Sequence, residues 1–327
     1  MQTRSKKKVV VIGGGMGSFV ILSGLRDYPL DLSVIVTVTD DGGSTGRLRD
    51  EFGFLPVGDM RQCIVALSED EAWLKQLMLY RFGKGRGLRG HNLGNLILTA
   101  LEDLTGSESK ALEVVDEIFA LRGEILPISL SSVKLGAEYK SGKMIISEHK
   151  IELNKLLNDR ILRLFTIPKA KINPAAQRVI LGADLIILGP GDLFNSTIAN
   201  IIIQGTTAAI QRSKAKILYI VNLMTLKSQT HNFKASDHVA AIENYLDVRV
   251  YYILINHEKI PDEIIKQYKK LDEYPVEDDL GIDRRVLRGN FLAKKVYRKS
   301  VSDSLKRSLL RHDSKKLAKA IMNFLKN

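Results

Sequence analysis

The chain has 327 residues, of which 45% are hydrophobic and 26% charged, and its formal net charge is +12. This length and composition are typical of a globular α/β protein with a substantial core. The apolar runs are far shorter than the roughly 18–20 residues of a membrane-spanning helix, and the basic N-terminus lacks the roughly 7–15 apolar residues of a signal peptide. The single Cys63 excludes an internal disulfide. We therefore expect a cytoplasmic protein.

The positive charge is concentrated near the C-terminus. Residues 284–327 contain fourteen Lys or Arg and only two acids, so the rest of the chain is balanced. A basic segment of this kind can bind nucleic acid, face an anionic membrane, surround the phosphates of a ligand, or form an exposed helix face. Nucleic acid is the least favoured of these, because the segment has no pattern of stacking aromatic residues.

The chain opens with an alternation of strand, helix and strand. Residues 8–12 form a β-branched run that ends at Gly13, which is typical of a strand buried on both faces of a parallel sheet. A helix is expected over residues 18–27 and a second strand over residues 32–39. This order predicts a Rossmann-like α/β fold with a mostly parallel, doubly wound sheet.

The middle of the chain predicts an insertion. Residues 58–121 show mainly helical spacing, and residues 125–153 change to short strands around a hairpin turn at residues 140–143. We expect this helical and then antiparallel subregion, residues 58–153, to lie within one elaborated domain that spans residues 1–327.

Strand-like runs resume after the insertion. Further parallel strands, two short strands and a closing helix are expected over residues 162–167, 184–188, 216–222, 250–255, 286–290, 294–298 and 314–325. The last three belong to the basic C-terminal subregion, residues 284–327.

The first strand leads into a glycine-rich turn, Gly13-Gly14-Gly15-Met16-Gly17. Glycine allows positive φ and lets backbone amides approach an anion, while the following helix N-terminus adds partial positive charge. Ser18 occupies a position where the dinucleotide-binding fingerprint needs Gly or Ala, and no Walker A lysine follows. The turn therefore predicts phosphate binding, with a purely structural tight turn as the alternative.

Two adjacent carboxylates, Asp40 and Asp41, follow the second strand, at the edge where open α/β sheets bind ligands. They repel each other unless a cation, ribose hydroxyls or donor groups meet them, and the pair suits Mg²⁺ held through ligand phosphates. The glycine-rich stretch 42–46 is expected to be a flexible, amide-rich loop, and Arg47 and Arg49 offer fork-shaped donors for phosphate. The alternative is an Asp-Gly turn with one helix-capping aspartate.

Two polar pairs lie in the predicted insertion. Asp59 and Arg61 stand at an expected helix start, where Asp59 can equally be a simple N-cap. His91 and Asn95 are four residues apart and share a face if a helix begins there. His91 can donate to a phosphate or act as an acid, although a lone loop histidine more often does neither.

A second glycine turn, Gly189-Pro190-Gly191-Asp192, follows the apolar run 184–188 on the same expected edge. Asn195 and Ser196 offer side-chain donors and acceptors beside it, and the strand 217–221 delivers Asn222 to that edge. Convergence of several polar turns on one crevice is the strongest indication of a ligand site. The sequence shows no Cys/His metal motif and no clear nucleophile–base pair, so the only catalytic candidates are Asp40, Asp41 and His91.

The chain resembles the gluconeogenesis factor (YvcK-like) family, which is related to 2-phospho-L-lactate transferase (CofD-like). Segments spread over nearly the whole chain carry the resemblance: GGGMG at 13–17, TDDGGSTGRLR at 39–49, GDMRQCIVAL at 58–67, LRGHNLGNL at 88–96, ADLIILGPGDLFNS at 183–196, ASDHVAAI at 235–242 and RHDSKKLAKAI at 311–321.

The resemblance implies a cytoplasmic bacterial protein that binds UDP-N-acetylglucosamine and supports cell shape, wall synthesis and growth on gluconeogenic carbon sources, with no assigned reaction. Its enzymatic relatives transfer a phospholactyl group to a deazaflavin alcohol with Mg²⁺. The chain departs from the usual family pattern at Val57, at Asp192 and at residues 227–230. In the otherwise unassigned C-terminal region, Tyr274 and Arg311 are our candidates for base stacking and phosphate contact.

Three functions remain open at this stage. In order of preference they are a nucleotide-sugar-binding regulator without turnover, a Mg²⁺-dependent phospholactyl-type transferase, and an NAD(P) oxidoreductase. The partner common to all is a phosphate-bearing small molecule, and a homo-oligomer remains possible. The expected ligand-binding residues are Gly13, Gly14, Gly15, Met16, Gly17, Asp40, Asp41, Gly42, Gly43, Ser44, Arg47, Arg49, Asp59, Arg61, His91, Asn95, Gly189, Pro190, Gly191, Asp192, Asn195, Ser196, Asn222, Tyr274 and Arg311.

Overall fold

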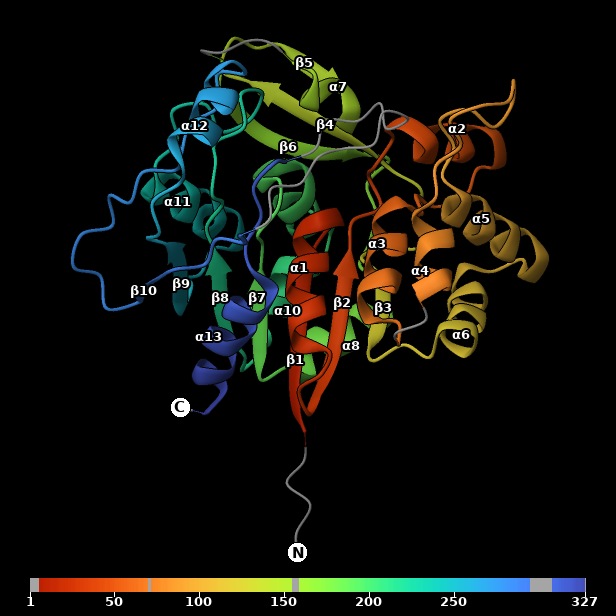
Figure 1. Cartoon of the computed structure of the whole chain (residues 1–327), viewed down its shortest axis with the longest axis horizontal. Coiled ribbons are helices and arrows are strands. Elements are labelled where there is room, and N and C mark those ends of the chain that lie inside the picture. Colours follow the sequence, from red (N-terminus) through yellow and green to blue (C-terminus); the bar gives the residue numbers. More distant parts are fainter. Residues whose placement is uncertain (1–5, 70–71, 155–158, 295–307, 327) are drawn as a thin grey trace, which may run out of the picture.

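The computed structural model describes residues 6–69, 72–154, 159–294 and 308–326 (Figure 1). Its centre is a seven-stranded, wholly parallel sheet with the order β10-β9-β8-β7-β1-β2-β3. These strands are β1 (Lys7–Gly13), β2 (Leu30–Val36), β3 (Glu124–Pro127), β7 (Leu185–Leu188), β8 (Lys216–Ile220), β9 (Tyr252–Asn256) and β10 (Val286–Gly289). The order runs outward in both directions from the central pair β1 and β7, which confirms the predicted Rossmann-like α/β fold.

Helices cover both faces of this sheet. On one face α1 packs against α3 and α13, and on the other α10 packs against α8 and α11. The bounds of these helices are α1 (Gly15–Leu25), α3 (Gly58–Leu67), α8 (Pro174–Gly182), α10 (Thr206–Arg212), α11 (Ala235–Leu246) and α13 (Ser314–Lys326). The remaining helical segments are α2 (Gly43–Phe52), α4 (Ala72–Leu79), α5 (Leu93–Thr105), α6 (Glu108–Phe119), α7 (Glu148–Glu152), the π-helical turn η1 (Leu193–Ile198), α9 (Ala199–Ile201) and α12 (Asp262–Lys269).

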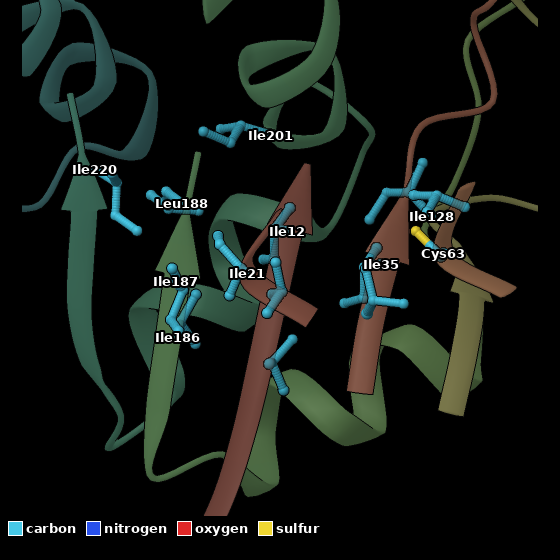
Figure 2. Close-up of a cluster of buried hydrophobic side chains, with 14 of the residues drawn as sticks. Ile12, Ile21, Ile35, Cys63, Ile128, Ile186, Ile187, Leu188, Ile201 and Ile220 are labelled. Atoms are coloured by element: carbon cyan, nitrogen blue, oxygen red, sulfur yellow. The ribbon is translucent and has the colours of Figure 1, made fainter. Parts of the chain in front are cut away.

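The core lies between the sheet and these helices (Figure 2). Ile12 of β1, Ile35 of β2 and Leu188 of β7 are completely buried, as the predicted two-sided burial of parallel strands requires. Cys63 of α3 is buried in the same cluster. Burial raises the pKa of its thiol, so the group is an apolar packing element rather than a nucleophile.

A small antiparallel sheet lies above the carboxyl ends of the parallel strands (Figure 1). It consists of β5 (Met144–Ile146), β4 (Lys134–Tyr139) and β6 (Ile161–Ile167), in that order. The hairpin between β4 and β5 confirms the turn predicted at residues 140–143.

Three local predictions are corrected by the structure. Residues 124–127 pair in parallel with β2 instead of joining the antiparallel sheet, and residues 161–167 pair with β4 in the antiparallel sheet instead of the parallel one. Short strands of this kind have the same periodicity whichever neighbour they pair with, so the sequence pattern does not choose between the sheets. The expected flexible loop at 42–46 instead begins α2 at Gly43.

The C-terminal elements agree in part with the prediction. The strand expected at 286–290 is β10, which adds to the parallel sheet, and the closing helix is α13. In the second expected strand, 294–298, Lys294 lies in a bend and the remaining residues lie outside those described.

Candidate functional site

A cavity of about 310 Å³ lies at the carboxyl ends of the central strands β1 and β7. The strand order reverses at this point, and open α/β sheets bind their ligands in the crevice that such a reversal leaves. The lining comes from the turn after β1, the segment after β2, the turn after β7, the segment after β8, helix α7 and residues 308–312. The structure therefore brings together segments that are far apart in the sequence.

The first glycine turn forms one wall of this cavity and is shaped partly by packing. A Cβ on Gly17 would lie 1.6 Å from the carbonyl oxygen of Pro190, and a Cβ on Gly14 would lie 2.2 Å from Oδ2 of Asp59. Gly15 has φ +49° and begins α1. Glycine is thus needed at position 17 for the first glycine turn to contact the second one at Pro190. This contact leaves the backbone amides at the start of α1 at the cavity wall.

Asn222 holds the second glycine turn in place. Its Nδ2 donates to the carbonyl oxygen of Gly191 over 2.8 Å, and its Oδ1 accepts from the Gly191 N–H over 3.4 Å. Asn200 supports the same region by donating to the carbonyl oxygens of Gly13, over 3.0 Å, and Ser196, over 2.6 Å. Asparagine side chains therefore fix both turns relative to each other.

Helix α7 contributes two acids that the sequence analysis did not identify, Glu148 and Glu152. Nδ2 of Asn195 donates to Oε1 of Glu148 over 2.8 Å, and the backbone N–H of His149 donates to Oδ1 of Asp41 over 2.8 Å. Asp41 thus anchors α7 and lines neither the main cavity nor the smaller chamber described below. The antiparallel hairpin before α7 determines where these acids lie, and no local motif marks them.

The cavity lining is strongly acidic. Among the described residues it contains the carboxyl groups of Asp40, Asp59, Glu148, Glu152, Asp192 and Glu273 and one guanidinium, that of Arg311. Burial raises the pKa of Glu148 well above its usual value, and the nearby charges of Asp40, Glu152 and Asp192 raise it further. An anionic ligand therefore needs a compensating cation, proton uptake by the carboxyl groups, or contacts concentrated at the helix N-termini.

The residues present fit a Mg²⁺ ion only in company with a ligand. Within the described residues no group of three or more His, Cys, Asp or Glu side chains is arranged to hold a metal. Magnesium commonly takes one or two carboxylates and completes its shell with phosphate oxygens and water. Asp40, which lines the cavity, can supply one such carboxylate.

The far end of the cavity is more apolar and is closed by the C-terminal segment. Tyr268 and Leu271 line it, and the Tyr268 hydroxyl accepts the N–H groups of Leu309 and Leu310 over 2.9 and 3.1 Å. His312 is buried there, and burial lowers its pKa to about 4, so its imidazole is neutral near pH 7. Tyr274 does not line the cavity; its backbone bonds to Thr225, which does.

A smaller chamber of about 50 Å³ adjoins the main cavity. It shares Gly15, Met16, Asp40, Gly42 and Asp59 with the larger space, and its other walls come from the beginnings of α2, α3 and α5 together with Arg81. Three of these additional residues, Ser44, Arg61 and Asn95, are among the ligand-binding residues predicted from the sequence.

His91 lies beside this chamber but does not line it. The helix α5 begins at Leu93 and is capped by Asn92, so His91 precedes it, and the shared helix face expected for His91 and Asn95 does not exist. Nδ1 of His91 lies 3.2 Å from Oγ of Ser44. Burial and the nearby charge of Arg47 lower the pKa of His91.

The predicted site residues fall into three groups. The main cavity is lined by Gly14, Gly15, Met16, Gly17, Asp40, Gly42, Asp59, Pro190, Gly191, Asp192, Asn195, Ser196, Asn222 and Arg311. The smaller chamber adds Ser44, Arg61 and Asn95. Outside both lie Gly13, Asp41, Gly43, Arg47, Arg49, His91, Gly189 and Tyr274.

The two arginines of the TGRLR motif have structural contacts. Arg49 is buried and donates to the carbonyl oxygens of Val133 and Asp40. Arg47 is exposed and donates to the carbonyl oxygen of Arg89 over 3.3 Å. These guanidinium groups therefore hold loops around the site.

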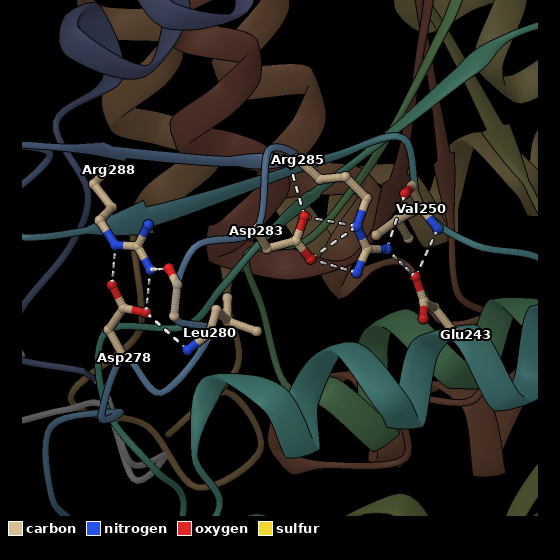
Figure 3. A network of polar contacts seen from close by, with 8 residues as sticks. Glu243, Val250, Asp278, Leu280, Asp283, Arg285 and Arg288 are labelled. Atoms are coloured by element: carbon tan, nitrogen blue, oxygen red, sulfur yellow. Dashed lines mark hydrogen bonds and ion pairs between the residues drawn. The ribbon is translucent and has the colours of Figure 1, made fainter.

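Part of the basic C-terminal subregion is neutralised within the protein (Figure 3). Arg285 pairs with Glu243 and Asp283 at 2.7 Å each, and Arg288 pairs with Asp278 at 2.5 Å. Arg311, by contrast, reaches the cavity wall. Only a portion of the C-terminal charge is therefore directed at a ligand.

The fold and the crevice define a Rossmann-like protein with a candidate ligand cavity where the strand order reverses, and comparison with known proteins identifies its family. The model of the family described as 2-phospho-L-lactate transferase CofD matches residues 9–294. A putative gluconeogenesis factor of Thermotoga maritima is 38% identical over 317 residues, covering 96% of this chain and 98% of that protein. The gluconeogenesis factor of Bacillus subtilis is 37% identical over 328 residues, covering 98% and 99% respectively.

A solved structure shows the same fold. The crystal structure of a member of the UPF0052 family from Bacillus halodurans has a TM-score of 0.88 and 36% identity, and it covers 98% of this chain and 99% of its own. The chain belongs to the CofD family and, within it, to the gluconeogenesis factors. No helix in the described part of the chain has both the length and the apolar character required to cross a membrane.

Proposed function

We propose that this protein is a nucleotide-sugar-binding regulator, with UDP-N-acetylglucosamine as the type of ligand. The observation that carries the proposal is the meeting of two glycine turns at one cavity where the strand order reverses. In this role the protein acts in the bacterial cytoplasm and supports cell shape, wall synthesis and growth on gluconeogenic carbon sources, as its resemblance to the gluconeogenesis factors implies.

The cavity has a polar and an apolar end, which suits the two halves of such a ligand. At the polar end the N-terminal amides of α1 and the turn at Gly191 offer a place for the diphosphate. At the other end Tyr268 and Leu271 offer an apolar surface for the uracil, and Arg311 lines the same cavity. The volume of about 310 Å³ lies within the range of small-molecule sites, roughly 300–1,000 Å³.

Isothermal titration calorimetry with UDP-N-acetylglucosamine, in the presence of Mg²⁺, tests the proposal. We expect saturable binding, weaker binding by Arg311→Ala, and unchanged binding by the control Arg288→Ala, whose side chain pairs with Asp278 away from the cavity. Absence of heat at millimolar ligand would contradict the proposal.

A second candidate, a phospholactyl-type transferase, is favoured by the match of residues 9–294 to the transferase family model. In that reaction the acceptor hydroxyl oxygen attacks the lactyl-bearing phosphorus of a guanosine-diphospho-lactate donor. The bond to the bridging oxygen breaks, the hydroxyl proton is released, and GMP leaves. Stabilisation of phosphate charge by the α1 N-terminus and Arg311 would supply most of the catalysis.

Product formation separates this candidate from the regulator. Incubation with the donor, a deazaflavin alcohol and Mg²⁺ releases GMP if the protein is a transferase. If no GMP forms while UDP-N-acetylglucosamine still binds, the regulatory function stands alone.

A further inference from the structure

The smaller chamber lies directly next to the main cavity and shares part of its wall. The two spaces share Gly15, Asp40 and Asp59 among their lining residues. Its volume of about 50 Å³ has room for several water molecules, since one needs roughly 10–15 Å³. This space suits one edge of a sugar ring with its substituents and is too small for a base and its ribose.

The walls of the chamber mix hydrogen-bond acceptors and donors. The carboxyl groups of Asp40 and Asp59 supply acceptors, and Arg61 and Asn95 supply donors. Nε of Arg61 donates to Oδ1 of Asn95 over 2.7 Å, which turns the amide Nδ2 toward the hydroxyls of α2, 3.4 Å from Oγ of Ser44. A mixed set of this kind matches hydroxyl groups, which donate and accept at once.

Gln62 of α3 is the feature of this chamber that the protein itself leaves incomplete. Its side chain lines the chamber and is only 7% exposed. Among the described residues its buried Oε1 has no hydrogen-bond partner. Leaving such an acceptor without a donor is costly for a folded protein, so an unpaired amide oxygen at a cavity wall indicates a ligand group that carries a proton.

We infer that this chamber is the subsite for the sugar of the nucleotide sugar, and that Gln62 accepts a hydrogen bond from a hydroxyl or amide N–H of that sugar. The inference rests on the proposed function, because it requires a nucleotide sugar in the main cavity. The chamber wall carries the carboxyl groups of Asp40 and Asp59 and the guanidinium groups of Arg61 and Arg81, so its charge does not select the ligand; a compact anion is disfavoured because it would offer the Gln62 oxygen no proton. Gln62 is therefore a specificity residue that separates UDP-sugars from plain UDP.

The test compares UDP-N-acetylglucosamine with UDP by calorimetry on the full chain. Wild-type protein is expected to bind the UDP-sugar more tightly than UDP. Gln62→Met keeps the length of the side chain but removes the amide, and it should weaken UDP-sugar binding about tenfold while leaving the affinity for UDP within about twofold. Gln62→Asn, which draws the amide back from the chamber, should show the same selective loss.

Gln76→Met is the control, because it makes the same substitution at an exposed position of α4 outside both cavities. It should leave both affinities unchanged. Retained UDP binding shows that the Gln62 variants are folded around the site. Equal losses for UDP and the UDP-sugar, or no loss at all, would overturn the subsite and leave the proposed function in place, whereas a wild-type protein that binds neither ligand would overturn both.

Discussion

Charged side chains are arranged differently in the ligand cavity and in the C-terminal arginine network, which consists of Arg285 and Arg288 with Glu243, Asp278 and Asp283. In the network, Arg285 and Arg288 each face carboxylates at 2.5–2.7 Å, so every charge in it has a partner of opposite sign. In the cavity, acids crowd together around Glu148. A paired network stabilises the folded chain, whereas carboxyl groups close enough to raise the pKa of a neighbour are typical of sites that bind a ligand or cation.

Of the variants considered for the two regions, Gly17→Ala in the cavity wall should have the largest effect. A Cβ there would lie 1.6 Å from a backbone oxygen of Pro190, so the two turns must separate. We expect at least about a hundredfold loss of nucleotide-sugar affinity and about 3 kcal/mol lower stability, since overpacking against backbone has no easy relief.

Gly182→Ala is the matched control for that variant. Gly182 is helical, at the end of α8, and no atom beyond its chain neighbours and the backbone of its own helix lies within 4 Å of a Cβ at this position. Alanine there should leave binding unchanged and keep stability the same or raise it slightly. Calorimetry and thermal unfolding measure both effects, and a Gly17→Ala protein that binds normally would show that contact between the turns is not needed.

Arg285→Ala and Arg311→Ala should separate stability from binding. Removing Arg285 leaves Glu243 and Asp283 without their cation, so we expect about 2 kcal/mol lower stability and unchanged affinity. Removing Arg311 should weaken nucleotide binding about tenfold or more. Urea unfolding and calorimetry check the pair, and equal effects of both variants on binding would erase the distinction between the regions.

Removing the charge of two glutamates, Glu148 and Glu243, should change the stability of the protein in opposite directions. The pKa of Glu148 is raised in the folded protein, so its contribution to stability is intact below the unfolded value near 4.5 and is lost as the pH rises toward the folded pKa. Glu148→Gln should therefore stabilise the protein at pH 8, by about 1 kcal/mol, and should flatten the dependence of stability on pH.

Glu243→Gln is its counterpart in the network. Oε1 of Glu243 accepts from Arg285 over 2.7 Å and from the N–H of Val250 over 2.9 Å. Neutralising it should destabilise the protein by about 1 kcal/mol. Urea unfolding at pH 5 and pH 8 compares the two variants. Destabilisation by both at pH 8 would contradict the difference in charge environment between Glu148 and Glu243.

The smallest expected effect concerns Mg²⁺. If Asp40 holds the ion through ligand phosphates, Mg²⁺ should strengthen nucleotide-sugar binding several-fold in the wild type and leave Asp40→Asn nearly unaffected. Titrations with Mg²⁺ and with a chelator measure this difference. A Mg²⁺ effect that persists in Asp40→Asn would place the ion elsewhere.

Much of the fold and half of the cavity wall follow from local sequence patterns. β-branched runs ending in glycine predict buried parallel strands and the edge at which their turns converge, and the structure shows both glycine turns there. Glu148 reaches the cavity through the hairpin before α7, and Tyr268 of α12 reaches it beside residues 309 and 310 of the C-terminal segment. Such placement depends on contacts between distant residues, which periodicity does not encode.

The role of individual residues was also beyond the sequence pattern. Asp41 and Asp40 are neighbours in the chain, yet Asp41 anchors α7 and Asp40 lines both cavities. Arg49 was expected to contact phosphate, but it is buried against Val133. Adjacent polar residues in a turn point in different directions, and only the packed structure shows which of them reach the cavity.

The most direct test of the central claim is a crystal structure of the protein with UDP-N-acetylglucosamine. We expect the diphosphate within hydrogen-bonding distance of the N-terminal amides of α1, beside the turn at Gly191, with the sugar reaching toward Gln62. A ligand bound away from the meeting point of these two turns would contradict it.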